Sequence, residues 1–428
     1  MMKINSIIKE LKKFDKVSDY AIQEIKTSTY EQFYDLQKLE TTRMTCTDEM
    51  SVRIYTKLQD GDKELLGNAS FIISHKISKN ELDKLIEDAI YQASFVKNEY
   101  YELVEGTKKL SFKQKAEEKD PFDILQDIAS IYFNAGRENA SFNALECFYN
   151  EYETHLVTSR GVDYKNVKHN IMVEAIPSFK ANSGKRLDNC ELYRMNRYEQ
   201  YNETKVKEDA ESAISDVLNR SKALKFSEHL NVNVIIKEEN VRNMLKELIV
   251  TYSYANVYSK SNFHKIGDAI QTNPKNPLNL SLIPSSKADY FDSDGVLLKE
   301  TKIISDGKLE SYFGNNRFAY YLKIKPTGIM NTMKVKNGKL SYEQMKKKPY
   351  IEILDLSGIQ VDLFADYIGG EVRLANYFDG ENTYPITAFS FSGSLKKCIN
   401  ELEFSKEQTK ITDYVGPKYA LLKDFEII

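Results

Sequence analysis

The chain of 428 residues is 41% hydrophobic and 29% charged, and its 60 basic and 63 acidic side chains give a formal net charge of −3. This composition is typical of a folded globular protein and excludes a largely disordered one. The near balance of charge gives no broad electrostatic reason to bind nucleic acid or an anionic membrane, so neither is expected as a partner.

Targeting and redox features of the sequence predict a cytoplasmic protein. Residues 1–14 place a charged side chain every few positions, which predicts a short amphipathic helix and not a signal peptide. No stretch approaches the ~18 consecutive apolar residues of a membrane-spanning helix. The four cysteines, Cys46, Cys147, Cys190 and Cys398, are scattered without a CxxC pair, which favours reduced thiols over a disulfide framework.

The distribution of turn-forming residues divides the chain near residue 225. Residues 1–225 contain two prolines and six glycines, whereas residues 226–428 contain seven prolines and twelve glycines. Denser turn residues indicate shorter strands and more frequent reversals. We therefore expect two domains, residues 1–225 and residues 226–428, which also suits a chain that is long for one core.

In the first domain a pattern of helix, strands and helix occurs twice, which suggests an internal duplication. Asp60-Gly61 predicts a hairpin turn, and Pro121 predicts the first turn of a helix. Long alternating strands between helices predict an antiparallel sheet with helices flanking one face. The helices are expected at residues 3–14, 81–96, 121–135 and 206–224, and the strands at 21–37, 51–59, 141–159 and 162–177.

The second domain is expected to be β-rich and α+β, which makes α+β the predicted class of the whole chain. It opens with a buried-strand pattern at 232–237 and a helical pattern at 239–255. One face of that helix combines Val241, Met244, Leu245, Leu248 and Ile249. Turn signals at Ser305-Asp306-Gly307, Gly369-Gly370 and Asp379-Gly380 predict chain reversals between short strands.

Five segments between Asn256 and Leu395 have a recognisable order and spacing. They read NVYSKSNF (256–263), FDSDGVLLKETKIISDGKLESYF (291–313), LSYEQMKK (340–347), DGENTYPIT (379–387) and FSFSGSL (389–395). Together they resemble the TldD/PmbA family, whose catalytic members are metallopeptidases marked by an HExxxH helix. The YxKSxF run at 258–263 and the LSxEQM run at 340–345 are similar to the PmbA branch, also called TldE, which lacks that motif. The resemblance covers residues 240–405, and extends loosely to THLVTSRGV (154–162) in the first half.

The metal chemistry of the catalytic members needs side chains that this sequence does not place together. A zinc peptidase holds its metal with two histidines on one helical face and uses a nearby glutamate as a base. The five histidines are His75, His155, His169, His229 and His264, and no two lie closer than 14 residues.

Counting back from SNF without gaps, the histidines implied by the resemblance fall at Met244 and Ile249, and the glutamate at Leu245. Glu247 is a remnant of that glutamate only if a gap is allowed. The family's third ligand is a cysteine near the C-terminus, whereas residues 412–428 contain none and Cys398 lies upstream. We therefore expect no catalytic residue, no metal ligand and no bound cofactor in this chain.

Three other groups of polar residues have ordinary structural explanations. FDSDG (291–295) begins like a calcium loop but lacks glycine at position six and a carboxylate at position twelve, so a turn is expected. Ser259, Ser261 and His264 suggest a nucleophile and base, but no third group is indicated, so polar loop residues are expected. The lysines at 346–348 are expected at a solvated helix end, with phosphate binding as the alternative.

A peptide-binding wall is expected at the loop that follows the former metal helix. Extended peptides bind by adding as a strand while aromatic pockets hold their side chains. Tyr258, Ser261 and Phe263 are the candidate residues, because their loop borders that helix.

The resemblance implies a non-catalytic subunit that pairs with a TldD-like, HExxxH-bearing chain and helps process or degrade small unstructured peptides. Zinc is then expected in the partner, and a homodimer is an alternative assembly. Two other hypotheses remain open: a peptide-binding or regulatory protein without a proteolytic role, and a self-sufficient hydrolase with an unrecognised site. The family is also associated with modulation of DNA gyrase, which the near-neutral charge does not favour.

Overall fold

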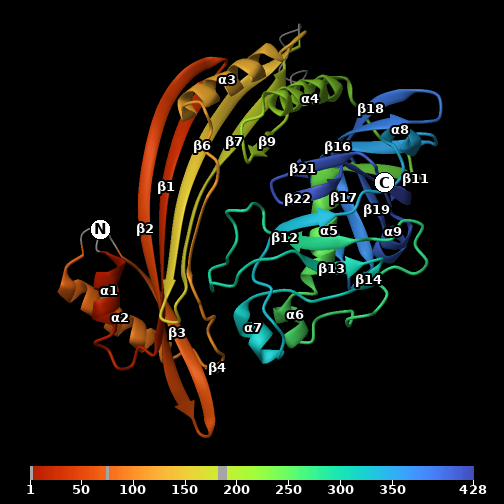
Figure 1. Ribbon diagram of the computed structural model, residues 1–428. Helices are drawn as coiled ribbons and strands as arrows, with labels where there is room; N and C mark the ends of the chain where they lie inside the picture. The colour runs from red at the N-terminus through yellow and green to blue at the C-terminus, as the bar shows by residue number, and fades with distance from the viewer. Residues whose placement is uncertain (1–2, 74–76, 182–189) are drawn as a thin grey trace.

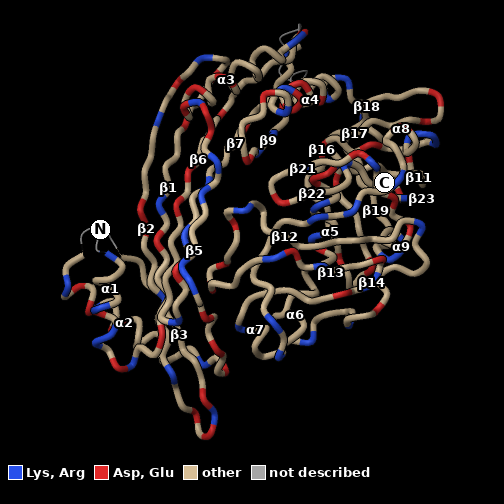
Figure 2. The backbone as a smooth tube through the Cα atoms, in the orientation of Figure 1, with Lys and Arg blue, Asp and Glu red and all other residues tan. Residues whose placement is uncertain are grey.

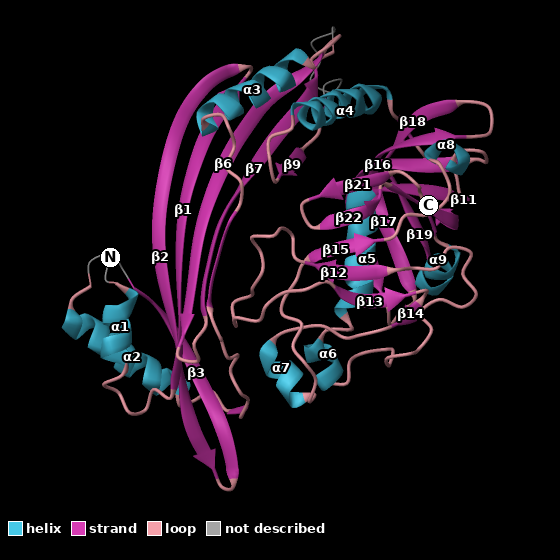
Figure 3. Ribbon diagram, viewed as in Figure 1, coloured by secondary structure: helices cyan, strands magenta, loops and turns pink. Residues whose placement is uncertain are grey.

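The computed structural model describes residues 3–73, 77–181 and 190–428. Within them a long curved sheet forms the N-terminal half, and two further sheets with short helices form the C-terminal half (Figures 1 and 3). This confirms the predicted α+β class and the β-rich character of the second half. His75 lies outside the described residues.

The N-terminal sheet has the order β4-β3-β2-β1-β6-β7-β5, and β8 and β9 also pair with β7. Its neighbours are antiparallel apart from the parallel pair β5–β7. The predicted turn at Asp60-Gly61 joins β2 to β3, where Asp60 pairs with Lys63 and Gly61 has φ +61°. The strands are β1 (Asp19–Asp35), β2 (Lys38–Asp60), β3 (Lys63–Ile73), β4 (Asn98–Glu99), β5 (Lys109–Lys113), β6 (Ala140–Thr158), β7 (Asp163–Phe179), β8 (Cys190–Glu191) and β9 (Arg194–Tyr198).

The helices described beside this sheet are α1 (Ile4–Leu11), α2 (Lys79–Ala93), α3 (Pro121–Asn134) and α4 (Glu203–Lys222). Ile22 of β1 is buried in the core cluster of α1 and α2, whereas Tyr30 packs on Phe122 of α3. Residues 22 and 30 differ by an even number, so both contacts lie on one face of the strand. In chain order the elements run α1-β1-β2-β3-α2 and then, after β4 and β5, α3-β6-β7-β8-β9-α4, so strands lie between two helices in each stretch. An internal duplication stays a prediction.

The C-terminal half contains an eight-stranded sheet, β10-β18-β17-β16-β11-β23-β19 with β20 beside β23, in which β17 also pairs with β19. A six-stranded sheet has the order β14-β13-β12-β15-β22-β21. The strands are β10 (Leu224–Lys225), β11 (Leu230–Lys237), β12 (Leu280–Ile283), β13 (Thr301–Ser305), β14 (Lys308–Leu309), β15 (Thr332–Val335), β16 (Tyr350–Asp362), β17 (Tyr367–Phe378), β18 (Thr383–Thr387), β19 (Phe389–Ser394), β20 (Glu403–Phe404), β21 (Gln408–Ile411), β22 (Tyr414–Pro417) and β23 (Tyr419–Ile427). The helices are α5 (Glu238–Val250), α6 (Tyr254–Tyr258), α7 (Asn316–Tyr321), α8 (Tyr342–Met345) and α9 (Leu395–Glu401).

Two local predictions for this half are wrong. Gly369 and Gly370 do not reverse the chain but lie inside β17, where a Cβ on Gly369 would sit 2.5 Å from the carbonyl oxygen of Phe391. The glycines therefore permit close strand packing. The helix predicted over 239–255 ends at Val250, because Ser253 caps a separate short helix by accepting from the backbone N–H of Asn256.

The two halves are joined through α4, which lies between the N-terminal sheet and strands β17 and β18 (Figure 1). Leu374 of β17 is fully buried in the core cluster that α3 and α4 form with β6 and β7. The strand β10, directly after α4, already pairs with β18. The exact boundary between the domains near residue 225 stays a prediction.

Candidate functional site

Helix α5 forms because its apolar residues recur at helical spacing and its first turn carries Glu238 and Glu239, which suit the positive end of the helix dipole. Its buried residues are the predicted set, Val241, Met244, Leu245, Leu248 and Ile249. They belong to the main core cluster of the C-terminal half. The predicted apolar face of this helix is therefore confirmed.

The positions that the family's zinc ligands would occupy are closed and apolar. Met244 and Leu245 are 0% exposed, and Ile249 is 4% exposed. Glu247 is exposed and so lies away from this buried face. Zinc sites use thiolate, imidazole or carboxylate ligands, and none of the three buried side chains supplies one. The residues present at this place do not fit a zinc ion.

The remaining candidate ligands are dispersed. Among residues 3–73, 77–181 and 190–428, no three His, Cys, Asp or Glu side chains lie close enough together to hold a metal ion. Cys398 is buried on α9, and burial raises the pKa of its thiol to about 12. Cys398 lies on α9, away from the buried face of α5 in sequence, and belongs with that face to the main core cluster of the C-terminal half.

Two of the three residues predicted to form a peptide wall, Tyr258 and Phe263, contact different elements with their rings. The ring of Tyr258 packs 5.6 Å from Phe318 and 5.2 Å from Tyr321, centroid to centroid, and its hydroxyl donates to Glu99 at 3.2 Å. Phe263 instead contacts Phe364, at 4.7 Å between ring centroids. Phe364 is 83% exposed at the tip of the β16–β17 hairpin.

Ser261 lies between these two contacts, with its hydroxyl 3.2 Å from that of Ser259. The imidazole of His264 makes its hydrogen bond to Tyr252, at 3.0 Å between Nδ1 and the phenol oxygen. Burial lowers the pKa of His264. No hydrogen bond among the described residues joins either serine to His264, so the geometry does not assemble a nucleophile and base. Peptide binding at Tyr258, Ser261 and Phe263 stays a prediction.

The FDSDG loop is a turn, as expected. Oδ1 of Asp292 accepts from the backbone N–H groups of Asp294 and Val296, both at 3.0 Å. Its Oδ2 accepts from the N–H of Ile329, also at 3.0 Å. Burial is the main cause that raises the pKa of Asp292, with the nearby charge of Asp294 adding to it. Both carboxylate oxygens are thus engaged by the backbone.

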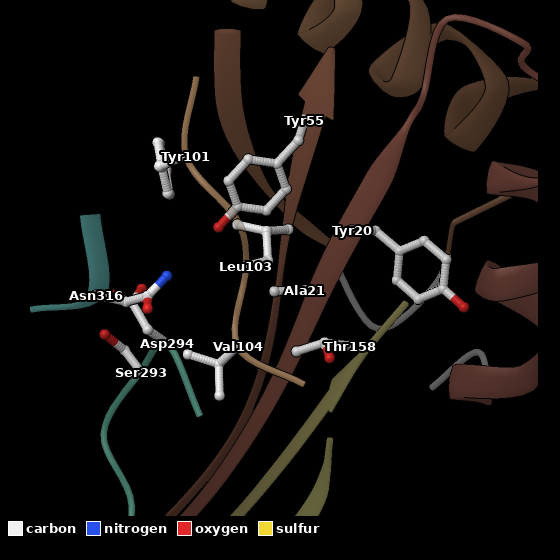
Figure 4. Close-up of a pocket in the computed structure, with 10 residues that line it drawn as sticks. All are labelled: Tyr20, Ala21, Tyr55, Tyr101, Leu103, Val104, Thr158, Ser293, Asp294 and Asn316. Carbon is white, nitrogen blue, oxygen red and sulfur yellow. The ribbon is translucent and has the colours of Figure 1, made fainter. Parts of the chain in front are cut away.

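A small cavity lies where this loop meets the N-terminal sheet (Figure 4). Its lining includes Tyr55, Tyr101, Asp294 and Asn316, while the ring of Tyr20 points away across the strand. The cavity volume is about 10 Å³. Such a volume holds about one water molecule, so this joint between the halves is too small for a peptide.

A much larger open cleft, of about 840 Å³, lies between the end of α4, the segment at residues 191–193 and strands β16 to β19. Its charged side chains include Arg220, Asp355, Glu371 and Arg373. None of these four was predicted from the sequence. In the sequence, each of these four residues looks like an ordinary surface charge, and the fold brings them together.

Charges of both signs alternate along the strands and loops of both halves (Figure 2). Among the described helices, none combines the length and apolar character needed to cross a membrane.

Comparison with known proteins places the C-terminal half in a family. Residues 230–428 match the PmbA/TldA metallopeptidase C-terminal domain. No curated protein matches the chain.

Solved structures match the chain over nearly its full length. TldE from Thermococcus kodakarensis has a TM-score of 0.80 at 16% identity, covering 99% of each chain. A proposed modulator of DNA gyrase from Bacteroides thetaiotaomicron has a TM-score of 0.78 at 14% identity, covering 99% of this chain and 97% of that one. A second proposed gyrase modulator, from Thermotoga maritima, has a TM-score of 0.74 at 12% identity and covers both chains completely, at 100%. Residues 230–428 therefore belong to the TldD/PmbA family, and the whole chain has the fold of TldE.

Proposed function

We propose that this protein is a TldE-like, non-catalytic subunit of a TldD/PmbA-type metallopeptidase system that processes small unstructured peptides. The observation that carries the proposal is the closed apolar face of α5, which includes Met244 and Ile249, the two residues to which the resemblance assigns the family's histidines. The fold likeness to TldE over 99% of both chains supports the same assignment.

In this proposal the metal and its chemistry belong to a partner subunit that carries the HExxxH motif. This chain contributes structure and peptide contacts, with Tyr258, Ser261 and Phe263 as one proposed contact region. The assembly is a heteromer, with a homodimer as the alternative. Scattered, unpaired cysteines support a cytoplasmic location.

A peptide-binding or regulatory protein without a proteolytic role is the second candidate. The observation that favours it is the open cleft of about 840 Å³, which this chain forms without a partner. A self-sufficient hydrolase has weaker support, because neither Ser259 nor Ser261 bonds His264 among the described contacts.

Complex formation tests the subunit role. The chain is mixed with an HExxxH-bearing homologue from the same genome and analysed by size-exclusion chromatography with light scattering. We expect a stable species that contains both chains. Separate elution at all concentrations up to tens of micromolar, roughly the range of weak specific complexes, would contradict the proposal.

Peptide affinity of the mixed complex tests the proposed contact region. Tyr258→Ala and Phe263→Ala should each weaken binding of an unstructured peptide, whereas Tyr91→Ala should not. Tyr91 is the matched control because it is an exposed aromatic on α2, 67% accessible, whose ring packs on Phe95 and not on this loop. Wild-type affinity in both variants would show that this loop is not part of the binding surface.

A further inference from the structure

The large cleft opens where strand β17 changes partners. Residues 367–372 of β17 pair with β19, whereas residues 375–378 pair with β18. The two residues between these runs are Arg373 and Leu374. Leu374 points into the buried cluster beneath α4, and Arg373 is exposed and lines the cleft.

The backbone at this fork is held in an uncommon conformation. Ala388, between β18 and β19, has φ +60°, and its N–H donates to the carbonyl of Val372 at 3.2 Å. A left-handed conformation at a residue other than glycine is strained and persists only where the surroundings impose it. Here the hydroxyl of Thr387 also donates to the carbonyl of Arg373 at 2.7 Å. The fork is therefore fixed, and the cleft beside it is pre-formed.

The charged groups of the cleft divide into engaged and free ones. Asp355 accepts from Arg194 at 3.5 Å, and Glu191 accepts from the amide of Asn143 at 2.6 Å. The Nε of Arg373 donates to the hydroxyl of Ser357 at 2.9 Å, and this is the one side-chain hydrogen bond of Arg373 among residues 3–73, 77–181 and 190–428.

The guanidinium of Arg220 and the carboxylate of Glu371 form no hydrogen bond or ion pair within the described part of the chain. Two guanidinium groups, those of Arg220 and Arg373, are thus available to a ligand, together with one carboxylate.

Free guanidinium groups in a pre-formed cleft suit an anion that presents two acceptor oxygens, as a carboxylate does. The planar fork of arginine donates two parallel hydrogen bonds to a carboxylate, a geometry that lysine does not offer. The volume of about 840 Å³ is far more than a small inorganic anion needs and suits a ligand of several residues. The exposed ring of Tyr193 supplies an apolar wall on the side of the N-terminal half.

We propose that this cleft binds the C-terminal carboxylate of an extended peptide, with Arg220 and Arg373 as its ligands. The inference rests on the proposed role in peptide processing and adds a feature of the substrate, a free C-terminus. Glu371 beside the arginines repels additional acidic groups and so disfavours peptides that are acidic near their end.

The test is isothermal titration calorimetry on the isolated full-length chain with one unstructured Gly/Ser-rich peptide in two forms, free acid and C-terminal amide. We expect the free acid to bind at least about tenfold more tightly, because charge-assisted hydrogen bonds to the carboxylate are lost on amidation. Arg373→Gln should reduce the affinity for the free acid by a similar factor and leave the amide unchanged. Glu371→Gln should raise the affinity for the free-acid peptide a few-fold, because it removes a negative charge that repels the peptide's carboxylate.

Two further variants separate binding from structure. Arg220 lies in the last turn of α4, where a positive charge stabilises the helix, so Arg220→Lys keeps that charge but loses the planar fork. We expect Arg220→Lys to keep the wild-type melting temperature and to bind the free acid more weakly. Arg137→Gln is the control, because Arg137 is exposed and does not line the cleft.

Equal affinity for the two peptide forms overturns the proposal, as does no binding of the free acid up to about 1 mM. Unchanged affinity in Arg373→Gln also overturns it. These outcomes concern the chain alone, whereas the subunit role is judged by complex formation and by cleavage in the mixture. Failure of the proposed carboxylate binding can therefore be distinguished from failure of the proposed subunit role.

Discussion

Histidines placed at the two former ligand positions should damage the core and create no metal site. Met244 is fully buried and Ile249 nearly so, and both contact other apolar residues of the C-terminal core. Replacing one of them by histidine gives up part of the ~1.5–3 kcal/mol that burial of an apolar side chain contributes. It also buries ring nitrogens without designed partners, at a cost of about 1–3 kcal/mol. We expect each single variant, Met244→His or Ile249→His, to lose about 2–4 kcal/mol of unfolding free energy.

The assay is urea unfolding monitored by far-ultraviolet circular dichroism at pH 8 and pH 5.5, with and without zinc. A buried histidine has a lowered pKa, so the unfolded state binds the proton more readily and stability falls further as pH drops below about 6.5. Glu247→His on the exposed face of α5 is the control and should change stability by less than about 0.5 kcal/mol.

Wild-type stability in a double variant Met244→His/Ile249→His would contradict a closed apolar face on α5. So would a zinc-dependent rise of several degrees in its melting temperature, roughly what 1–2 kcal/mol of binding gives in a chain of this size. Either result would show that the face of α5 is open and polar enough to hold a metal.

Three further predictions follow from other contacts. Leu374→Ala should lower the free energy of unfolding by about 2–5 kcal/mol, because Leu374 is fully buried in the cluster beneath α4. An unchanged urea midpoint would show that this contact does not stabilise the two halves. Burial lowers the pKa of His264, so the wild-type urea midpoint should fall as pH drops from about 6.5 toward the folded-state pKa; His264→Gln should flatten this part of the profile, and an unaltered slope would contradict it. Asp292→Asn should lower the free energy of unfolding by about 1–3 kcal/mol, because the amide nitrogen would face a backbone N–H that donates to the carboxylate in the wild-type protein. Wild-type stability in the same assay would show that these hydrogen bonds contribute little.

Much of the fold could be predicted because its signals are local. Alternation along β1 and β6, the Asp60-Gly61 turn and the capped proline start of α3 each depend on a few neighbouring residues. The end of α5 was missed because Ser253, read as one more helical residue, caps a new helix. Gly369 was misread because a glycine that permits close strand packing looks the same in sequence as one that makes a turn.

The candidate site was harder to predict because its parts are distant in sequence. The apolar face of α5 follows from helical periodicity and could be read directly. The cleft combines Arg220, Arg373 and the strained Ala388, which come from three separate elements. Their proximity depends on which strands pair at the fork of β17, and single-sequence patterns do not specify that pairing. Tyr258 and Phe263 are close in sequence, but their rings contact different elements.

Cleavage of an unstructured peptide in the presence of zinc distinguishes a non-catalytic subunit from a self-sufficient hydrolase. The peptide is incubated with this chain alone, with an HExxxH-bearing homologue alone, and with the mixture of the two. A non-catalytic subunit predicts no cleavage by this chain alone and cleavage by the mixture. Cleavage by the purified chain in the absence of any partner would contradict the account, because it would require a catalytic site that Met244 and Ile249 cannot form.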